Sequence, residues 1–585
     1  MPAAVACAGA EPWVKVTTDH FTILTPAGEP VAKKWAVELE QFRRGLQRIV
    51  PVGVERLRPV TVVLFINDKS MEPYVPLEKG TPAKLGGLFV RANDINTIML
   101  SLARDARETR HVIFHEAVHW QLSAFDSVMP LWLGEGLAEL YATFEMTDEN
   151  AYAFGAAMPS HVRQLRGGKI LPLPQLLAID RSSLLYNEGA RTGIFYAQSW
   201  AFVHFLLYGE DAPGQPRLMY YLELLRNPAT RESAFITAFG AEPAELEKRL
   251  RSYIMGGTYL KHHYARRSTD KIERMLKVGP ATEADLELAK GSLLFGTRTA
   301  EAAEPYMWRA AQLAPEDPRA WEMLGHVALA RKDFPAAFSA LGRAAAAGST
   351  SYLVYHNLAV SRLPEPTFAG RLAPPLDPRE MDAAAEDYRQ AIRLAPTHLP
   401  SYEGLAGLVY GMQTVDAGDA DILQRGLQQS AQNTMIEVGI AAVEIRSGRA
   451  ADGRARLEWL CARNAGRTDP GTQFARRILA DEKLKAELDE IEWLVKEKRF
   501  VEGIRIADRA LERPLEPAHR QLLAGLRRRI ADFNQIKEAV TLANRGQDSA
   551  ATQMLETLVL SGPDHAVKVE AQRILREIAG RQPGL

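Results

Sequence analysis

The sequence lacks several features that would place it in common protein classes. Its 585 residues include only two cysteines, Cys7 and Cys461, too few for a disulfide framework. Basic residues (71) and acidic residues (72) nearly balance and are interspersed, so the sequence has no cluster of basic residues of the kind that binds nucleic acid. No uninterrupted apolar stretch reaches the ~18 residues that a membrane span needs. The composition therefore predicts a globular chain without a transmembrane segment, long enough for roughly two to four domains.

The first ten residues are small and apolar. They end in Ala8-Gly9-Ala10 before Glu11 and resemble the tail of a secretory signal whose charged and hydrophobic parts are missing. The alternative is a short disordered terminus. We therefore slightly favour a periplasmic or secreted location with a truncated signal peptide, and a cytoplasmic location is the alternative.

The most informative segment is His115-Glu116-Ala117-Val118-His119. Residues four apart on a helix share one face, so both histidines can bind one metal ion. Glu116 lies beside them, where a carboxylate can act as a general base. His111, one turn earlier, is interpreted as an ordinary helix residue. The alternative for the whole segment is a set of polar groups on a helix that binds no metal.

A second predicted helix carries the segment Trp132-Leu133-Gly134-Glu135-Gly136. Its glutamate follows the second histidine by 135 − 119 = 16 positions. A catalytic zinc site needs three protein ligands and one open position, and Glu135 supplies the third ligand. Glu139 falls on the same helical face and is a candidate acceptor for the free ring N–H of His115 or His119. The alternative for Glu139 is a surface carboxylate.

These motifs resemble those of the gluzincin metallopeptidases, which include thermolysin-like and aminopeptidase N-like enzymes. His115, Glu116 and His119 match the HExxH motif, and the segment around Glu135 matches the aminopeptidase-like pattern. The chain is most similar to the peptidase MA-like group of bacterial proteins, often joined to tetratricopeptide repeats, over roughly residues 11 to 260. The resemblance implies that Zn²⁺ is bound by the two histidines and Glu135, and that Glu139 contacts the first histidine.

The resemblance extends to Tyr196-Ala197-Gln198-Ser199, whose leading tyrosine stabilises the tetrahedral intermediate in the family. The family usually has Lys-Gly where this chain has Gln198-Ser199. A core position is the alternative for Tyr196, because apolar residues follow it at helical spacing. The chain has no upstream Gly-x-Met-Glu-Asn segment to anchor a substrate amino terminus, so aminopeptidase specificity is not expected.

The residues before the HExxH segment predict a small sheet. Residues 60–66 are a buried strand bounded by Asn67-Asp68, and residues 32–50 have helical spacing. In gluzincins the edge strand of this sheet binds the substrate backbone, and residues 86–90 or 95–100 are the candidates for that strand. Residues 150–264 are predicted to be mainly helical and to form the second lobe of a cleft.

After about residue 280 the sequence becomes rich in alanine and repeats itself. Trp321, Leu324 and Gly325 begin a unit whose counterpart begins at Tyr355, a shift of 355 − 321 = 34 residues. This is the tetratricopeptide period. A proline-rich insertion lengthens one unit around residues 363–378, and residues 436–462, 491–511 and 533–560 each predict a helical hairpin.

The predicted fold is therefore an α+β zincin-like metallopeptidase domain, with a small mixed sheet and a helical lobe, followed by an all-α tetratricopeptide-type solenoid. The predicted domains are residues 11–265, 280–430 and 431–585. The predicted function is zinc-dependent peptide-bond hydrolysis, in which Glu116 moves the proton and Tyr196 donates to the oxyanion. The repeats would bind the substrate or a protein partner. The rival functions are a catalytically idle scaffold and a zinc hydrolase with another substrate.

Overall fold

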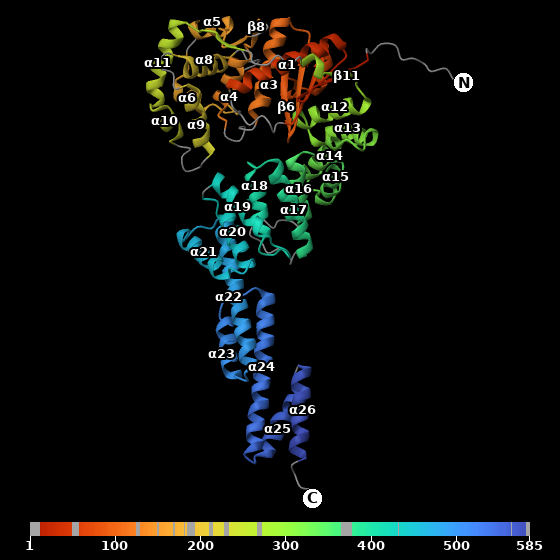
Figure 1. The fold of residues 1–585 in the computed structure, drawn as a ribbon, viewed down its shortest axis with the longest axis vertical. Helices are drawn as coiled ribbons and strands as arrows, with labels where there is room; N and C mark the ends of the chain where they lie inside the picture. Colours follow the sequence, from red (N-terminus) through yellow and green to blue (C-terminus); the bar gives the residue numbers. More distant parts are fainter. Residues whose placement is uncertain are drawn as a thin grey trace, which may run out of the picture. The chain divides into compact units, whose positions relative to one another are not determined.

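A computed structural model provides the fold, shown in Figure 1. It describes the following residues: 12–49, 58–123, 129–148, 151–167, 170–180, 182–183, 193–209, 214–226, 233–265, 272–363, 377–430, 432–562 and 564–580. The prediction for residues 1–10, with Cys7, lies outside this part of the chain.

The chain forms two compact units. The first contains Met1–Thr367, Ala373–Thr414 and Gln428–Ala431, and the second contains Phe368–Leu372, Val415–Leu427 and Gln432–Leu585. The HExxH segment and the clearest repeats thus share the first unit. Among the described residues, no helix is both long and apolar enough to cross a membrane.

The first unit is built on a six-stranded sheet in the order β11-β1-β2-β3-β7-β6. The strands are β1 (Val14–Thr17), β2 (Phe21–Thr25), β3 (Val60–Phe65), β6 (Gly87–Ala92), β7 (Ile95–Ser101) and β11 (Lys277–Pro280). β2, β3 and β7 run parallel to one another, whereas β1, β6 and β11 pair antiparallel with their neighbours. The sheet is therefore mixed. Of the two candidate edge strands, β6 lies at the edge and β7 lies inside the sheet.

Both faces of the sheet are covered by helices. Val62 and Leu64 point into a core shared with α1 (Glu29–Ile49) and α3 (Ala106–Leu122). Val63 points the other way and packs with α12 (Glu283–Thr297), the first repeat helix. This alternation is the two-residue period of a strand that is buried on both sides. The repeats thus cover the face of the sheet opposite α1 and α3.

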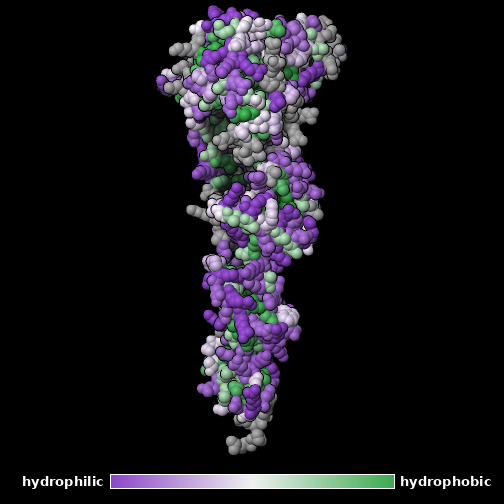
Figure 2. Space-filling view, turned by 90° about the vertical axis from the view of Figure 1, so that its left-hand side faces the viewer, coloured by the Kyte–Doolittle hydropathy of each residue, from purple (hydrophilic) through white to green (hydrophobic). Residues whose placement is uncertain are grey.

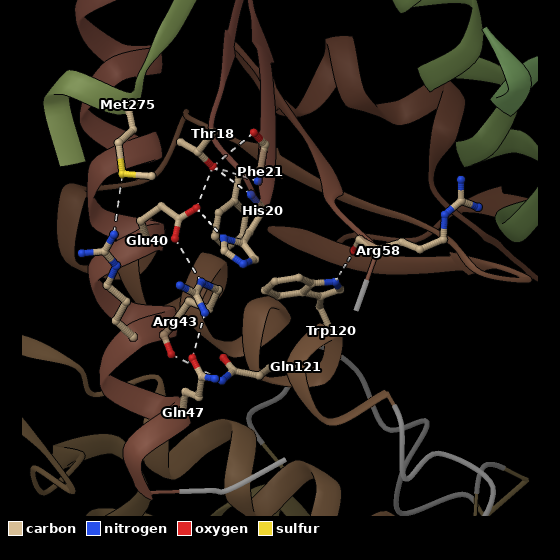
Figure 3. A network of polar contacts seen from close by, with 11 residues as sticks. Thr18, His20, Phe21, Glu40, Arg43, Gln47, Arg58, Trp120, Gln121 and Met275 are labelled. Carbon is tan, nitrogen blue, oxygen red and sulfur yellow. Dashed lines mark hydrogen bonds and ion pairs between the residues drawn. The ribbon is translucent and has the colours of Figure 1, made fainter. Parts of the chain in front are cut away.

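Polar contacts of Glu40 and Arg43 on α1 join this helix to the turn between β1 and β2 and to the end of α3 (Figure 3). Glu40 accepts hydrogen bonds from Thr18 Oγ1 at 2.7 Å and from Arg43 Nε at 3.0 Å, and its Oε1 lies 3.0 Å from His20 Nδ1. The amide of Gln121, at the end of α3, donates to the backbone oxygen of Arg43 at 3.4 Å. Burial opposes the charged carboxylate, but these partners outweigh it and lower the pKa of Glu40 to about 2.

The pKa of Glu40 predicts an acid-sensitive contribution to stability. Because the folded pKa of about 2 lies below the ordinary value of 4.5, the carboxylate stabilises the fold above pH 4.5 and loses this effect as pH falls toward 2. We expect Glu40→Gln to lower the free energy of unfolding by about 3–5 kcal/mol at pH 7 and to flatten its pH dependence in that window. Urea unfolding at a series of pH values measures both. The matched control is Glu29→Gln on the exposed first turn of α1. If the free energy of unfolding had the same pH dependence in the two variants, the prediction would be contradicted.

The rest of the N-terminal part is a lobe of helices with a small second sheet. The helices are α4 (Leu131–Tyr141), α5 (Pro159–Gly167), α6 (Leu173–Ala178), α8 (Ile194–Tyr208), α9 (Gly214–Arg226), α10 (Ala234–Phe239) and α11 (Pro243–Gly256). The sheet joins β10 (His262–Ala265), β9 (Ala151–Phe154) and β8 (Glu145–Asp148). The described part of residues 150–264 is thus mainly helical, as predicted, and β9 and β10 are short aromatic-rich strands within it that pair with each other.

The helical repeats are confirmed. In the first unit they are α12, α13 (Ala300–Leu313), α14 (Pro318–Ala330), α15 (Phe334–Ala346), α16 (Tyr352–Arg362), α17 (Pro378–Leu394) and α18 (Leu399–Leu408). The repeated small residues permit close helix packing, because a Cβ at Gly325 would lie 2.5 Å from Leu341 Cδ2. Most of the predicted insertion at 363–378 lies outside the described residues.

The second unit continues the helical hairpins. It contains α20 (Thr434–Arg446), α21 (Ala450–Arg463), α22 (Pro470–Lys496), α23 (Phe500–Leu511), α24 (Pro517–Asn544), α25 (Asp548–Ser561) and α26 (His565–Ala579). The three predicted hairpins are each found as two helices with a turn between them. Leu484 of α22 packs with α23, whereas Gly471 of the same helix lies against the start of α20. On the face of the molecule seen in Figure 2, hydrophobic residues are scattered among hydrophilic ones.

Candidate metal centre

The helix α3 carries the HExxH segment on a buried surface. Asp105 caps the helix by accepting the backbone N–H groups of Arg107 and Glu108, both at 2.9 Å. Phe114 and Ala117 pack into the main core and fix the rotation of the helix. The histidines therefore face α4.

The helix α4 brings the third predicted ligand to this surface. It begins after Pro130 and is buried along nearly its whole length. A Cβ at Gly136 would lie 2.5 Å from the backbone oxygen of Ser199, so only glycine permits the close packing of α4 and α8. Gly136 thereby fixes the position of the neighbouring Glu135.

Three ligand atoms converge between the two helices. Nε2 of His115 and Nε2 of His119 are 3.1 Å apart, and Oε2 of Glu135 lies 3.3 Å from the first and 3.4 Å from the second. Zinc bonds of about 2.0–2.1 Å in a tetrahedron place neighbouring ligand atoms about 3.3–3.4 Å apart. The donor set and its spacing therefore fit a tetrahedral Zn²⁺ site. These three residues form one of the two clusters of possible metal ligands found among the described residues.

The electrostatics of this cluster suit a cation. The side chains of His115 and Glu135 are 1% and 7% exposed, whereas that of His119 is 26% exposed. Burial opposes the charge on Glu135, but the two histidines outweigh burial and lower its pKa well below the ordinary value. The cluster thus combines two imidazoles with an ionised carboxylate, a common zinc donor set.

Glu139 lies behind the ligands and contacts three histidines. Its Oε1 is 3.0 Å from Nδ1 of His115. Its Oε2 is 3.1 Å from Nε2 of His111 and 3.0 Å from Nε2 of His161. Burial would raise the pKa of Glu139, but the charge of His111 and the hydrogen bonds of the three histidines hold it well below its usual range. A carboxylate at Nδ1 of His115 fixes the tautomer that leaves Nε2 for a metal.

Two of these histidines were not predicted as part of the site. His111, interpreted from the sequence as an ordinary helix residue, lies in α3 and its ring contacts Glu139. The signal available in the sequence was that His111 lies one helical turn before His115. His161 comes from α5 and is 4% exposed, and no sequence spacing relates it to the motif.

The predicted general base lies against the edge strand. Glu116 is 1% exposed, and its Oε2 accepts a hydrogen bond from the backbone N–H of Phe89 at 2.7 Å. Phe89 is in β6, whose other edge pairs with β7. The N–H of Phe89 thus points away from the sheet, and the outer edge of β6 faces the HExxH helix.

Tyr196 lies in the first turn of α8 and is 8% exposed. Its ring contacts that of Phe195, and its role as an oxyanion donor stays a prediction. Gln198, which departs from the family pattern, has a structural role. Its amide accepts the backbone N–H of Leu171 and donates to the oxygen of the same residue, both at 2.7 Å. Gln198 therefore attaches α8 to the segment before α6.

Comparisons with known proteins bear mainly on the repeats. No family model matches the chain, and no curated protein matches it. A tetratricopeptide repeat protein from Parabacteroides merdae is 12% identical, with 51% of this chain and 100% of that chain covered and a TM-score of 0.24. A thermophilic TPR protein in Thermus thermophilus is 16% identical, with 34% and 99% covered and a TM-score of 0.20. Yeast Tom70 is 12% identical, with 81% and 88% covered and a TM-score of 0.19. Because these TM-scores are low, the evidence for helical repeats in this chain is the set of helices and their packing described above.

Proposed function

We propose that this protein is a zinc-dependent peptidase of gluzincin type whose helical repeats bind the substrate or a protein partner. The observation that carries the proposal is the convergence of ligand atoms from His115, His119 and Glu135 at separations that suit tetrahedral zinc. A fourth residue, Glu139, contacts Nδ1 of His115, the ring nitrogen that does not face the other two ligands. Such support is typical of metal sites that hold their ligands in one orientation.

Bound zinc would polarise a carbonyl oxygen and lower the pKa of a water molecule toward ~7. Glu116 is next to the first ligand in the sequence and is held in place by Phe89. In the proposed reaction this carboxylate takes a proton from water and passes it to the leaving amine. Tyr196 donates a hydrogen bond to the developing oxyanion.

The edge strand β6 supports a peptide as the substrate class. β6 is the edge strand of the sheet, and edge strands are where sheets pair with extended peptides by strand addition. Phe89 lies in this edge strand, and its N–H donates to Glu116. A peptide paired with β6 would therefore pass beside the proposed base. This arrangement favours a peptide bond over a small soluble substrate.

The test combines metal analysis with cleavage of a diverse peptide library. We expect about one zinc ion per wild-type chain and cleavage that a chelator abolishes. Glu135→Gln removes an anionic ligand, so zinc affinity should fall by at least about tenfold and cleavage with it. Glu145→Gln is the matched control, because this exposed glutamate lies in the same lobe and its side chain pairs with half-buried Lys261 rather than with the metal cluster. A wild-type chain that binds no zinc would refute the proposal.

The helical repeats favour a second candidate, a catalytically idle scaffold that binds protein partners. Arrays of helical hairpins present extended surfaces to other proteins, and in this chain the array runs from α12 to α26, with α19 (Ala417–Gln429) between α18 and α20. The same library separates the two functions. If the chain binds stoichiometric zinc but shows no cleavage that depends on Glu116, the result would favour the scaffold.

A further inference from the structure

The hairpin of β6 and β7 ends in a turn that lies against the repeats. The turn consists of Asn93 and Asp94, and Asn93 has a φ of 59°, a left-handed conformation that asparagine tolerates better than most residues. On either side, Ala92 is 1% exposed and Ile95 is 9% exposed. Both pack in one apolar core with residues of α12, α14 and α16. The tip of the edge hairpin therefore packs against the repeats on the side of Ala92 and Ile95.

The repeats also bind this turn through polar groups. The hydroxyl of Ser351, at the start of α16, donates to Asp94 Oδ2 at 2.5 Å. The other carboxylate oxygen of Asp94 lies 3.2 Å from Nη1 of Arg58, which precedes β3. Asp94 is 7% exposed and Ser351 is fully buried. The contact is therefore shielded from solvent.

A second buried contact joins Arg58 to the repeats. Its guanidinium donates two hydrogen bonds to Glu322 of α14, at 2.7 and 3.1 Å. Glu322 is fully buried and also accepts the hydroxyl of Ser349 at 2.6 Å. Apolar residues of similar volume would stabilise such an interface equally well. A buried bidentate pair instead fixes one relative placement of the groups it joins.

Both contacts lead to the candidate metal centre by short routes. From Asp94, strand β6 runs back to Phe89, whose N–H holds Glu116. From Arg58, the backbone oxygen accepts the indole N–H of Trp120 at 3.3 Å, as Figure 3 shows, and Trp120 follows the ligand His119. In addition, Arg91 of β6 donates to the backbone oxygen of Ser123 at 3.1 Å, just after α3.

We infer that Ser351 and Glu322, both in the repeats, are positioning residues for the proposed peptidase site. Ser351 holds the edge hairpin directly and Glu322 holds it through Arg58, so that Phe89 orients Glu116. The ligands themselves lie on α3 and α4, outside the hairpin. Loss of the contact should therefore impair turnover and spare zinc binding. This inference rests on the proposed function.

The test uses the full chain with Ser351→Ala. This variant removes the hydroxyl donated to Asp94, together with the N-cap of α16. Thr299→Ala is the matched control, since Thr299 caps α13 in the same array and has no described contact with the hairpin. We expect kcat to fall about tenfold to a hundredfold in Ser351→Ala only, because small displacements of catalytic groups have effects of this size. Zinc affinity should stay within about twofold of the wild type.

Amide hydrogen exchange of residues 87–92 gives a readout that does not need cleavage. We expect faster exchange of this strand in Ser351→Ala than in Thr299→Ala. Asp94→Asn keeps an acceptor for Ser351 but removes the charge facing Arg58, and it should produce the same result. Equal exchange and equal kcat in Ser351→Ala and Thr299→Ala would overturn the inference. If the wild-type chain cleaves no peptide, the proposed function fails, and the exchange rates alone decide whether the repeats hold β6.

Discussion

Replacing Glu116 by glutamine should reduce peptide cleavage by about 10²–10⁴-fold, the range that general acid–base groups contribute. Glutamine keeps the shape of the side chain, and its amide oxygen can still accept the N–H of Phe89. It cannot take up the proton that the carboxylate would receive. The change therefore isolates proton transfer from the geometry of the site.

Zinc binding provides the control for this variant. His115, His119 and Glu135 are untouched in Glu116→Gln, so the zinc content should equal that of the wild type. Measurement of kcat on the best library peptide, beside metal analysis of the same preparations, tests both expectations. A variant that cleaves at the wild-type rate would show that Glu116 is not the base.

Removing the repeats should unfold the part of the chain that carries the metal centre. A chain ending at residue 281 would lose α12, which packs with Val63, Val90 and Met99 on one face of the sheet. Each apolar side chain exposed in this way costs about 1.5–3 kcal/mol. Several such side chains approach the ~5–15 kcal/mol that stabilises a typical protein. We therefore expect aggregation or a loss of fixed tertiary structure.

Size-exclusion chromatography and near-ultraviolet circular dichroism measure this outcome. The matched control is a chain that ends at residue 431, because it retains the helices of the first unit. It should remain monodisperse and bind zinc. A monodisperse chain of residues 12–281 with native-like circular dichroism would contradict the prediction.

The sequence was informative where local spacing determines contacts. The four-residue interval between His115 and His119 places both on one helical face, and the structure brings them together with Glu135. The repeats were recognisable because each hairpin needs small and large residues at fixed intervals.

Other parts of the site depend on contacts between distant segments. His161 reaches Glu139 from α5, and the N–H of Phe89 reaches Glu116 from β6. No local pattern encodes such pairs. The strand β10 was also missed, because its partner β9 lies more than a hundred residues earlier in the chain. The catalytic role of Tyr196 and the zinc ion itself stay predictions that the experiments above address.

The long helices of the second unit limit how this array can change its length. α22 packs at one end with α20 and at the other with α23, and α24 likewise serves two successive cores through Ile530 and Ala543. In an ordinary tandem array, one hairpin can be duplicated or deleted as a module. Here a deletion that removed part of α22 or α24 would cut a helix that packs with two successive hairpins. The successive hairpins of the second unit are therefore coupled through these shared helices, so that unfolding of one hairpin would expose apolar side chains of the next.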